Sequence, residues 1–284
     1  MEQLLEVRGL CKRYPDFSLD HVDLTVSAGT IVGLIGENGA GKTTTIKAVL
    51  NVIRPDGGSV RLFGRDPSDP EARAQAAAVF EDSYFYGGLT IRQISRSMAG
   101  ICPVWDEGLF FNDCARFGLG EKKPVKDFSR GMRMKLSLAT ALARHPRLLV
   151  LDEATSGLDP VVRGEMLDLF LEFIQDESHA VLLSSHITTD LERIADQIAY
   201  LHQGRLLFQE DKDRLLEDLA VVRCAASDLD RLPGELILAR QSGAFGQAAL
   251  ARHPAELRRY LPEAIIDKVS IDEMMQFYGR GETE

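Results

Sequence analysis

The stretch GENGAGKT, residues 36–43, constrains this chain more than any other part of the sequence. Its glycines, lysine and threonine have the spacing of a phosphate-binding loop, in which successive backbone N–H groups surround phosphate oxygens. The apolar run over residues 30–35 is typical of a strand buried on both faces, and Ile46, Val49 and Leu50 follow the loop at helical spacing. Because this strand, loop and helix are the context that the motif requires, the sequence predicts a nucleoside triphosphate site.

The residues of this loop form the first set of predicted site residues. The backbone N–H groups are expected to surround the phosphates, the Lys42 ammonium to reach the β and γ phosphates, and the Thr43 hydroxyl to bind Mg²⁺. The predicted nucleotide-binding residues of the stretch are Gly36, Asn38, Gly39, Ala40, Gly41, Lys42, Thr43 and Thr44.

A second motif, LLVLDE, lies at residues 148–153. Its apolar run predicts a buried strand, and a helix over residues 161–174 and a strand over residues 180–185 follow, so the order implies a parallel sheet flanked by helices. Carboxylates after a strand are also common where a strand simply meets solvent. Beside a phosphate loop, however, Asp152 is expected to hold Mg²⁺ through water, and Glu153 to polarise the water that attacks the γ phosphate.

Two further segments predict the parts of the fold around this sheet. Near residues 22–26 apolar residues alternate with polar ones, as in a half-buried antiparallel strand. Between the two motifs, residues 89–120 have a mostly helical pattern, and we interpret residues of about 89–140 as a helical subdomain. The apolar residues at helical spacing there include Phe110, Phe111, Cys114 and Phe117.

The pattern changes after the stretch AYLHQGRLLF, which predicts a hairpin with its turn at Gln203 and Gly204. Residues 211–284 then show a charged helix, three short strand-like runs, a second helix, another strand-like run and a final helix. We therefore predict a main domain over residues 1–210 and a small C-terminal α+β accessory region over residues 211–284.

Composition limits the possible classes of function. The chain has 284 residues and a formal net charge of −10, which disfavours general binding to nucleic acid, since that binding depends on clustered lysine and arginine. The four cysteines are scattered without a CxxC pair, so they indicate neither a zinc site nor a disulfide framework and fit a reducing cytoplasm. No apolar run approaches the roughly 18 residues that cross a bilayer, and no signal peptide pattern is present. We expect a chain that does not span a membrane by itself.

The stretch FSRGM, residues 128–132, comes just before a predicted helix over residues 132–145. Ser129 is a favoured N-cap, because its hydroxyl accepts a bond from an unpaired backbone N–H. Gly131, in contrast, weakens a helix by roughly 1 kcal/mol relative to alanine. Arg130 adds positive charge at the end of the helix dipole that repels it. An anion bound at this helix N-terminus would explain both residues.

Together these motifs resemble those of the nucleotide-binding subunits of ABC (ATP-binding cassette) transporters, over roughly residues 3–210. FSRGM stands where that family has its signature sequence LSGGQ, and residues 128–132 are called the signature segment below. SGLD, residues 156–159, matches the D-loop, and SSH, ending in His186, matches the switch histidine. The resemblance implies ATP as the nucleotide. It also implies a P-loop ABC fold of the α/β class, with a mixed sheet core, an antiparallel β subdomain and an α-helical subdomain.

The resemblance further implies an ATP-driven dimer. Two cassettes pack head to tail, so that the signature segment of one points at the γ phosphate held by the other. Ser129 and Gly131 then contact phosphate, and Arg130 and the helix dipole add positive potential. Asp159 crosses the interface, and His186 bonds the γ phosphate and helps to place the attacking water.

Three further positions can be compared with the usual residues of the family. Tyr14 stands where the family places an aromatic ring against adenine. Glu81 stands where the family usually has the glutamine that senses Mg²⁺ and contacts the membrane partner, and a carboxylate there can bind the metal directly or through water. Arg130 replaces a glycine of LSGGQ. The R-G-M signature, the acidic pair Glu81 and Asp82, and the ending MMQFYGRG at residues 274–281 resemble bacterial ATPases of the ABC-2 exporter kind.

The expected partners also follow from the resemblance. One is a separately encoded integral membrane permease, docked on the face formed by the Glu81 loop and the helical subdomain. The other is a second cassette, in a homodimer or a heterodimer. The protein would lie in the cytoplasm on the inner face of the cell membrane, attached through the permease, with no nucleic acid partner.

Two alternatives stay open. One is a soluble ATPase of this type acting on the ribosome or DNA. Relatives that act in translation carry two cassettes in one chain, and relatives that act in DNA repair carry long coiled coils or zinc hooks. This sequence shows neither feature. The other is a degenerate cassette that binds ATP as a regulated scaffold. The intact Lys42, Asp152, Glu153 and His186 argue against the second alternative.

Overall fold

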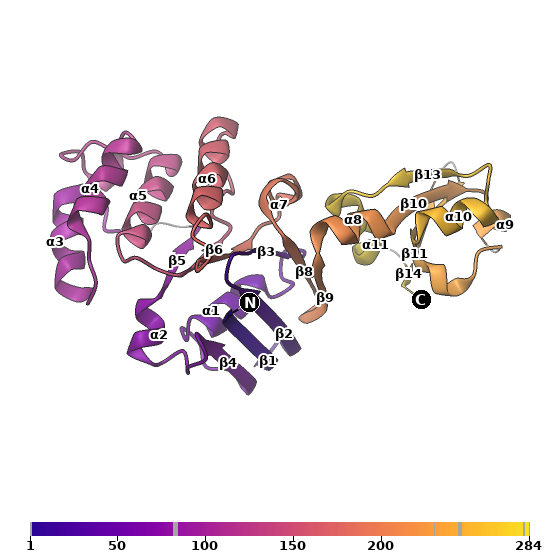
Figure 1. Cartoon of the computed structure of the whole chain (residues 1–284), viewed down its shortest axis with the longest axis horizontal. Coiled ribbons are helices and arrows are strands. Elements are labelled where there is room, and N and C mark those ends of the chain that lie inside the picture. Colours follow the sequence, from indigo (N-terminus) through magenta and orange to yellow (C-terminus); the bar gives the residue numbers. More distant parts are fainter. Residues whose placement is uncertain (1, 82–84, 230, 244–245, 281, 284) are drawn as a thin grey trace. The chain divides into compact units, whose positions relative to one another are not determined.

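The computed structural model describes residues 2–81, 85–229, 231–243, 246–280 and 282–283 (Figure 1). The chain divides into two compact units, Met1–Gln209 and Glu210–Glu284. Each unit has its own sheet and its own hydrophobic cluster. Asp82, one of the two acids of the predicted pair, and Gly281, at the end of MMQFYGRG, lie outside the described residues.

A six-stranded sheet forms the centre of the first unit. In spatial order its strands are β5 (Ala76–Phe80), β6 (Leu148–Asp152), β7 (Ala180–Ser184), β3 (Ile31–Ile35), β8 (Gln197–His202) and β9 (Arg205–Asp211). The first five are parallel to their neighbours, and β9 follows β8 through the predicted turn at Gln203 and Gly204, both of which have a positive φ. The strands β3, β6 and β7 are buried along their whole length, as their apolar runs predicted.

Helices connect these strands, as the alternation of patterns predicted. The connecting helices include α1 (Lys42–Val49), α2 (Pro70–Ala74), α6 (Pro160–Phe173) and α7 (Thr188–Ile194). Met166 and Phe170 of α6 are fully buried. The helix after the phosphate loop and the helix after the second motif are thus confirmed.

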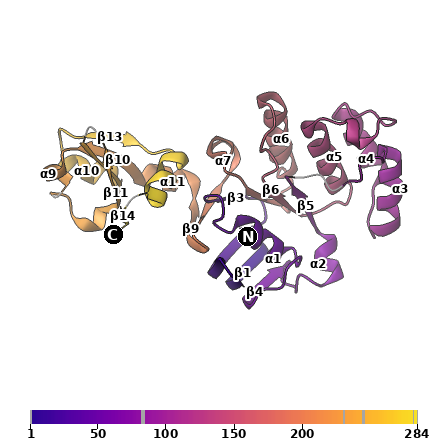
Figure 2. The same cartoon turned by 180° about the vertical axis from the view of Figure 1, so that it is seen from behind.

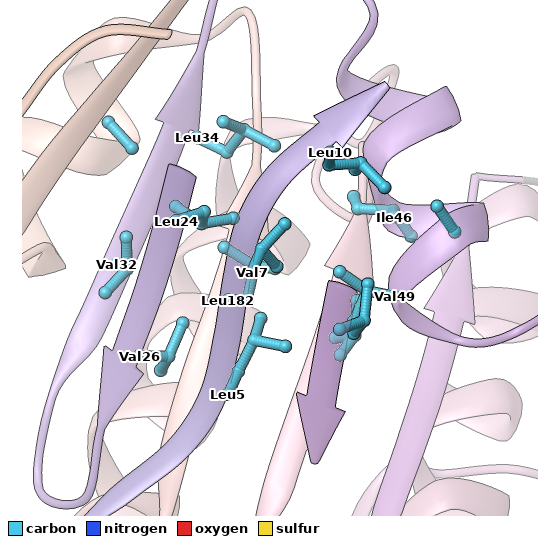
Figure 3. Packing of buried hydrophobic residues seen from close by; sticks show 14 of the residues in the cluster. Leu5, Val7, Leu10, Leu24, Val26, Val32, Leu34, Ile46, Val49 and Leu182 are labelled. Carbon is cyan, nitrogen blue, oxygen red and sulfur yellow. The ribbon is translucent and has the colours of Figure 1, made fainter. Parts of the chain in front are cut away.

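A second, antiparallel sheet covers part of the first. Its strands are β2 (Phe17–Ser27), β1 (Gln3–Tyr14) and β4 (Gly57–Leu62), in that spatial order. Figure 3 shows the hydrophobic cluster that joins the two sheets and α1, with Val7 and Leu24 of the antiparallel sheet facing Leu182 of β7. The predicted alternation near residues 22–26 is confirmed, since Val22, Leu24 and Val26 are buried between more exposed neighbours.

The predicted helical subdomain contains α3 (Ile91–Ile101), α4 (Glu107–Arg116) and α5 (Arg130–Leu142), which lie together in Figure 1. They share a hydrophobic cluster of their own, to which Phe110, Cys114 and Leu136 contribute buried side chains. Phe111 and Phe117 pack against this cluster and are only partly buried. The helix α5 begins two residues earlier and ends three residues earlier than its apolar spacing predicted.

The second unit is a five-stranded antiparallel sheet with helices (Figure 2). Its helices are α8 (Lys212–Asp218), α9 (Ala226–Leu229), α10 (Pro254–Tyr260) and α11 (Ile271–Arg280). In spatial order its strands are β13 (Ile265–Lys268), β10 (Leu219–Cys224), β12 (Gly246–Arg252), β11 (Ile237–Gly243) and β14 (Glu282–Thr283). The α+β pattern is as predicted, apart from the short elements α9 and β14, which the sequence did not indicate.

None of the described helices combines the length and the apolar character needed to cross a membrane.

Candidate active site

The predicted site residues follow the carboxyl ends of four neighbouring parallel strands. In the sheet register Phe80 of β5 lies opposite Asp152 of β6, and Asp152 lies opposite Ser184 of β7. Ser184 in turn lies opposite Leu34 of β3, which leads into the phosphate loop. Side chains that follow parallel strands at one edge of a sheet come close together, so this register gathers residues from distant parts of the sequence.

The phosphate loop wraps the N-terminus of α1. Gly36, Gly39 and Gly41 all have a positive φ, of 155°, 87° and 110°, a region that glycine enters at little cost. A Cβ atom at Gly36 would lie 2.2 Å from the carbonyl oxygen of Leu201, so a side chain there has no room. At Gly39 a Cβ atom would meet nothing within 4 Å. The loop therefore presents bare backbone to open space at its tip.

Lys42 is almost completely buried at the centre of this loop, with 6% of its surface exposed. Its Nζ donates to the carbonyl oxygens of Gly36, at 2.7 Å, and Glu37, at 3.3 Å. Burial lowers the pKa of the Lys42 ammonium, and the carboxylates of Glu153 and Asp152 act in the opposite direction. The closer carboxylate oxygen, Glu153 Oε1, is 3.8 Å away. Carbonyl oxygens accept hydrogen bonds from this buried ammonium but do not neutralise its positive charge. A phosphate would supply the neutralising negative charge, so Lys42 fits an anionic ligand.

The two acids after β6 have different surroundings. Asp152 is 5% exposed, and Ser184 donates from its Oγ to Asp152 Oδ1 at 2.6 Å. Glu153 has a φ of 54°, and its carboxylate Oε2 lies 2.6 Å from His186 Nδ1. The backbone N–H of His186 also donates to Oε2, at 3.4 Å. The three predicted residues Asp152, Glu153 and His186 are thus brought together, with Glu153 held from two sides by Lys42 and His186.

Glu153 and His186 line an open cavity of about 630 Å³, whereas Asp152 is not part of its lining. From the phosphate loop Asn38, Gly39, Gly41, Lys42, Thr43 and Thr44 reach it, and so do Glu81, Glu153 and His186. Gly36 and Ala40 instead support the loop from behind: Ala40 donates to the carbonyl of Glu37 and accepts from the N–H of Gly204. The residue types and their common cavity suit a phosphate ester with a divalent cation.

Four residues that line the cavity were not predicted: Asp16, Phe17, Glu37 and Ser156. Glu37 and Ser156 lie inside motifs that the sequence shows, but no feature of either residue type marked it. Asp16 lies in the turn before β2 and Phe17 is the first residue of β2, and neither belongs to a motif. Tyr14 lines an adjoining cavity of about 580 Å³ that shares Asp16 and Phe17. The residue is 44% exposed, and the Lys12 ammonium lies 5.8 Å from the centroid of its ring.

The signature segment begins α5 with a capped turn. Ser129 is the N-cap and accepts from the N–H of Met132 at 3.2 Å, while Phe128 is buried in the helical cluster. Gly131 is buried, and a Cβ atom there would lie 3.1 Å from Val162 Cγ1 of α6, so the glycine also permits close helix packing. Arg130 pairs with Glu81, with 2.7 Å between Nη2 and Oε1.

Asp159 forms the N-cap of α6. Its Oδ1 accepts from the N–H groups of Val161, at 3.2 Å, and Val162, at 3.1 Å. This cap gives Asp159 a structural role within its own chain, and it places the D-loop residues 156–159 between β6 and α6.

The chain is similar to known ATP-binding proteins. The family model described as ABC transporter matches residues 19–156. The bacitracin transport ATP-binding protein BcrA of Bacillus licheniformis is 34% identical over 220 residues, which cover 76% of this chain and 72% of that protein. This chain belongs to the ABC transporter ATP-binding proteins. It is therefore an ATP-binding and ATP-hydrolysing transporter subunit, as the motifs indicated.

Other ABC transporter proteins give the same result. The daunorubicin/doxorubicin resistance ATP-binding protein DrrA of Streptomyces peucetius is 33% identical over 251 residues, covering 84% of this chain and 76% of that protein. A solved structure of an ATP binding subunit of an ABC transporter has a TM-score of 0.66 and 30% identity, and covers 75% of this chain and 92% of its own. The predicted ABC fold is thus confirmed.

This ABC subunit has another, largely apolar cavity, of about 420 Å³. It lies between the end of α1, the strand β5 and the end of α3, where the residues Val52 and Ile101 are 63% and 74% exposed. Arg73 and Arg144 also line it, and Arg144 Nη2 donates to the carbonyl of Arg73 at 3.2 Å. Within the described part of the chain its lining includes no carboxylate.

Proposed function

We propose that this subunit powers an exporter, with Lys42, Glu153 and His186 at its hydrolytic centre. The observation that carries the proposal is the convergence of these three side chains on a cavity that the phosphate loop also lines. The relatives named for bacitracin transport and for daunorubicin and doxorubicin resistance support export as the direction of transport. We assign residues 1–210 to the cassette and residues 211–284 to an accessory region.

The phosphate loop would bind the β and γ phosphates of ATP. The Lys42 ammonium, which bonds to the carbonyls of Gly36 and Glu37, would bond phosphate oxygens as well. The bare backbone of the loop and the first turn of α1 would donate N–H groups to the same oxygens. Tyr14, whose exposed ring lies beside the cavity, would stack on the adenine.

Glu153 would act as the general base that takes a proton from the attacking water. Its carboxylate faces the cavity and is oriented by His186 Nδ1, which leaves His186 Nε2 as the ring nitrogen that would bond the γ phosphate. The positive φ of Glu153 directs the side chain away from the strand and toward the cavity.

Mg²⁺ would neutralise negative charge on the phosphate oxygens when it is bound. The Thr43 hydroxyl and, through water, Asp152 are the residues that would hold it. Asp152 fits this role because the Ser184 hydroxyl already orients its carboxylate. Glu81 lines the same cavity, but its carboxylate is paired with Arg130 and would reach a metal only after leaving that pair.

A second cassette would complete the site, in a homodimer or a heterodimer. Ser129 is exposed at the N-terminus of α5. The helix dipole places partial positive charge at this end, which favours an anion there. Ser129 and the backbone at Gly131 would thus contact the γ phosphate held by the partner subunit, and Asp159 would lie at the interface between the two. Arg130 would add positive potential at this interface, and the negative charge of its partner Glu81 would reduce that potential.

The partner that crosses the membrane would be a permease docked in the apolar cavity beside β5. Its exposed Val52 and Ile101 side chains would be covered on docking, which removes apolar surface from water. Arg73 and Arg144 at the same cavity would pair with a carboxylate on the permease segment. The subunit would then lie on the cytoplasmic face of the cell membrane.

Purification of the tagged protein from detergent-solubilised membranes of its own host tests this function. We expect a membrane protein with several spans to accompany it in stoichiometric amount, identified by mass spectrometry. A matched preparation of the Val52→Asp, Ile101→Asp variant should lose that protein while it keeps ATP hydrolysis. Recovery of a ribosomal or chromosomal complex in place of any membrane protein would contradict the exporter function.

A further inference from the structure

Two residues that depart from the usual pattern of the ABC family are in contact. Glu81 follows β5, where the family usually has glutamine, and Arg130 begins α5, where the signature sequence has glycine. They lie 49 residues apart in the sequence, yet Arg130 Nη2 is 2.7 Å from Glu81 Oε1. A change from glutamine to glutamate adds one negative charge, and a change from glycine to arginine adds one positive charge. The two departures therefore cancel in charge and meet in space.

The Arg130 side chain also touches the D-loop. A Cβ atom built on Gly157, which has a φ of +64°, would lie 2.8 Å from Arg130 Cζ. A side chain at this position would therefore displace the guanidinium. Arg130 thus connects three segments: the end of β5 through Glu81, the D-loop through Gly157, and the N-terminus of α5 through its own backbone.

The position of Glu81 links this pair to the nucleotide. Glu81 lines the same cavity as Lys42, Glu153 and His186, and its side chain is 50% exposed. A carboxylate without a partner at this rim would repel the phosphates of ATP. The guanidinium of Arg130, placed at the helix end where positive charge is unfavourable, is stabilised in turn by the carboxylate.

We propose that Arg130 and Glu81 act as one positioning pair, in which Arg130 neutralises Glu81 at the rim of the nucleotide cavity and Glu81 fixes the signature segment against the D-loop. This inference rests on the proposed function. Neither residue reacts with ATP. Arg130 keeps the cavity attractive to a triphosphate, and Glu81 keeps the N-terminus of α5 in the orientation in which Ser129 can face the partner subunit's nucleotide.

The test restores the usual family residues one at a time and then together, with the full-length protein. R130G leaves Glu81 uncompensated, so we expect the KM for ATP to rise about fivefold to tenfold. E81Q leaves the cavity less negative but the signature segment unpaired, so we expect KM at or below the parent value and kcat reduced about tenfold. The double variant R130G/E81Q should recover both constants to within about twofold of the parent.

A KM that rises in R130G but not in E81Q distinguishes this pairing from a merely structural role. R130K, which keeps the charge but not the fork of the guanidinium, should keep KM near the parent value and lower kcat partly. Losses that simply multiply in the double variant, or an unchanged KM in R130G, would overturn the proposal. Thermal unfolding of each variant checks that it is folded; if R130G is not, R130Q replaces it with the same expectation.

A matched ion pair provides the control. Arg116 of α4 and Glu172 of α6 lie 2.5 Å apart with side chains 53% and 57% exposed, and neither residue lines the nucleotide cavity. R116Q and E172Q, alone and together, should leave KM and kcat within about twofold of the parent. The proposed function fails separately from the pairing, because it fails if no membrane protein accompanies the parent protein from the membranes of its host.

Discussion

The two halves of the nucleotide site differ in how completely one chain builds them. At the phosphate loop Lys42 and Asp152 are 6% and 5% exposed, and each has a hydrogen-bond partner in place. At the signature segment Ser129 is exposed, and the Arg130 side chain is 42% exposed. Buried polar groups with partners are costly to rearrange, whereas exposed ones are free to meet a new surface. This difference fits the proposed arrangement, in which the phosphate-loop half is formed within one chain and the signature half is presented to a partner.

The largest expected effect lies in the phosphate-loop half. In Glu153→Gln the side chain keeps its size but can no longer take a proton from water, so kcat should fall by about 10³-fold. ATP binding should persist, and the ATP-bound protein should accumulate as a dimer. Phosphate release and size-exclusion chromatography with ATP measure the two effects. Hydrolysis at the parent rate would remove Glu153 from the assigned mechanism.

Lys42→Ala should weaken the binding of ATP to a single chain, without a partner subunit. Loss of charged hydrogen bonds to phosphate costs about 2 to 3 kcal/mol, which corresponds to roughly 10²-fold weaker ATP binding. Equilibrium binding of a fluorescent ATP analogue at concentrations too low for dimers measures it. Lys212→Ala, on the second unit, is a suitable control and should bind as the parent does.

Ser129→Ala should act on the dimer and spare the monomer. We expect turnover to fall by about tenfold and monomer affinity for ATP to stay within twofold, since the serine would contact only the partner subunit's nucleotide. Loss of the N-cap should also lower the free energy of unfolding by about 1 kcal/mol. An equal loss of ATP affinity in the monomer would contradict the division into two halves.

A mixture of the two preceding variants sharpens the comparison. A mixed dimer of Lys42→Ala and Ser129→Ala contains one site with both parts intact, because each part comes from a different chain. If the sites act independently, an equal mixture should reach roughly a quarter of the parent rate, although Ser129→Ala alone keeps only about a tenth of it. A mixture no more active than its components would show that the site is not shared between chains.

The smallest effect is expected at Gly131. Its alanine variant gains helix propensity of up to about 1 kcal/mol but places a methyl group against Val162, so stability should change little. If Gly131 serves only helix packing, any loss of turnover in Gly131→Ala comes from the contact of the new methyl group with Val162. The double variant Gly131→Ala/Val162→Ala should then have full turnover. Persistent loss of turnover in that double variant would assign the glycine to phosphate contact instead.

The sequence predicted the phosphate-loop half in detail, because its chemistry is local. The loop, the buried strand before it and the helix after it lie within 20 consecutive residues, so spacing alone identified them. Asp152 and Glu153 were likewise predicted from local sequence, because they stand at the end of an apolar strand and directly after it. Phe17 was missed because an aromatic residue at the start of an alternating strand has no local feature that points to a ligand.

The signature half was predicted less completely, because its contacts are not local. The pairing of Arg130 with Glu81 spans 49 residues and depends on the approach of α5 to the end of β5. The contact between Gly131 and Val162 depends likewise on how α5 packs against α6. The sequence explained Gly131 and Arg130 through an anion, whereas the structure adds a neighbour within the chain for each.

The bonds from Lys42 to the carbonyls of Gly36 and Glu37 have a consequence for the kinetics of nucleotide exchange. Since the lysine already holds the loop in its wrapped form, nucleotide entry needs no slow closure of the loop. ATP and ADP would then associate at similar rates, and the difference in their affinities would lie in how fast each dissociates.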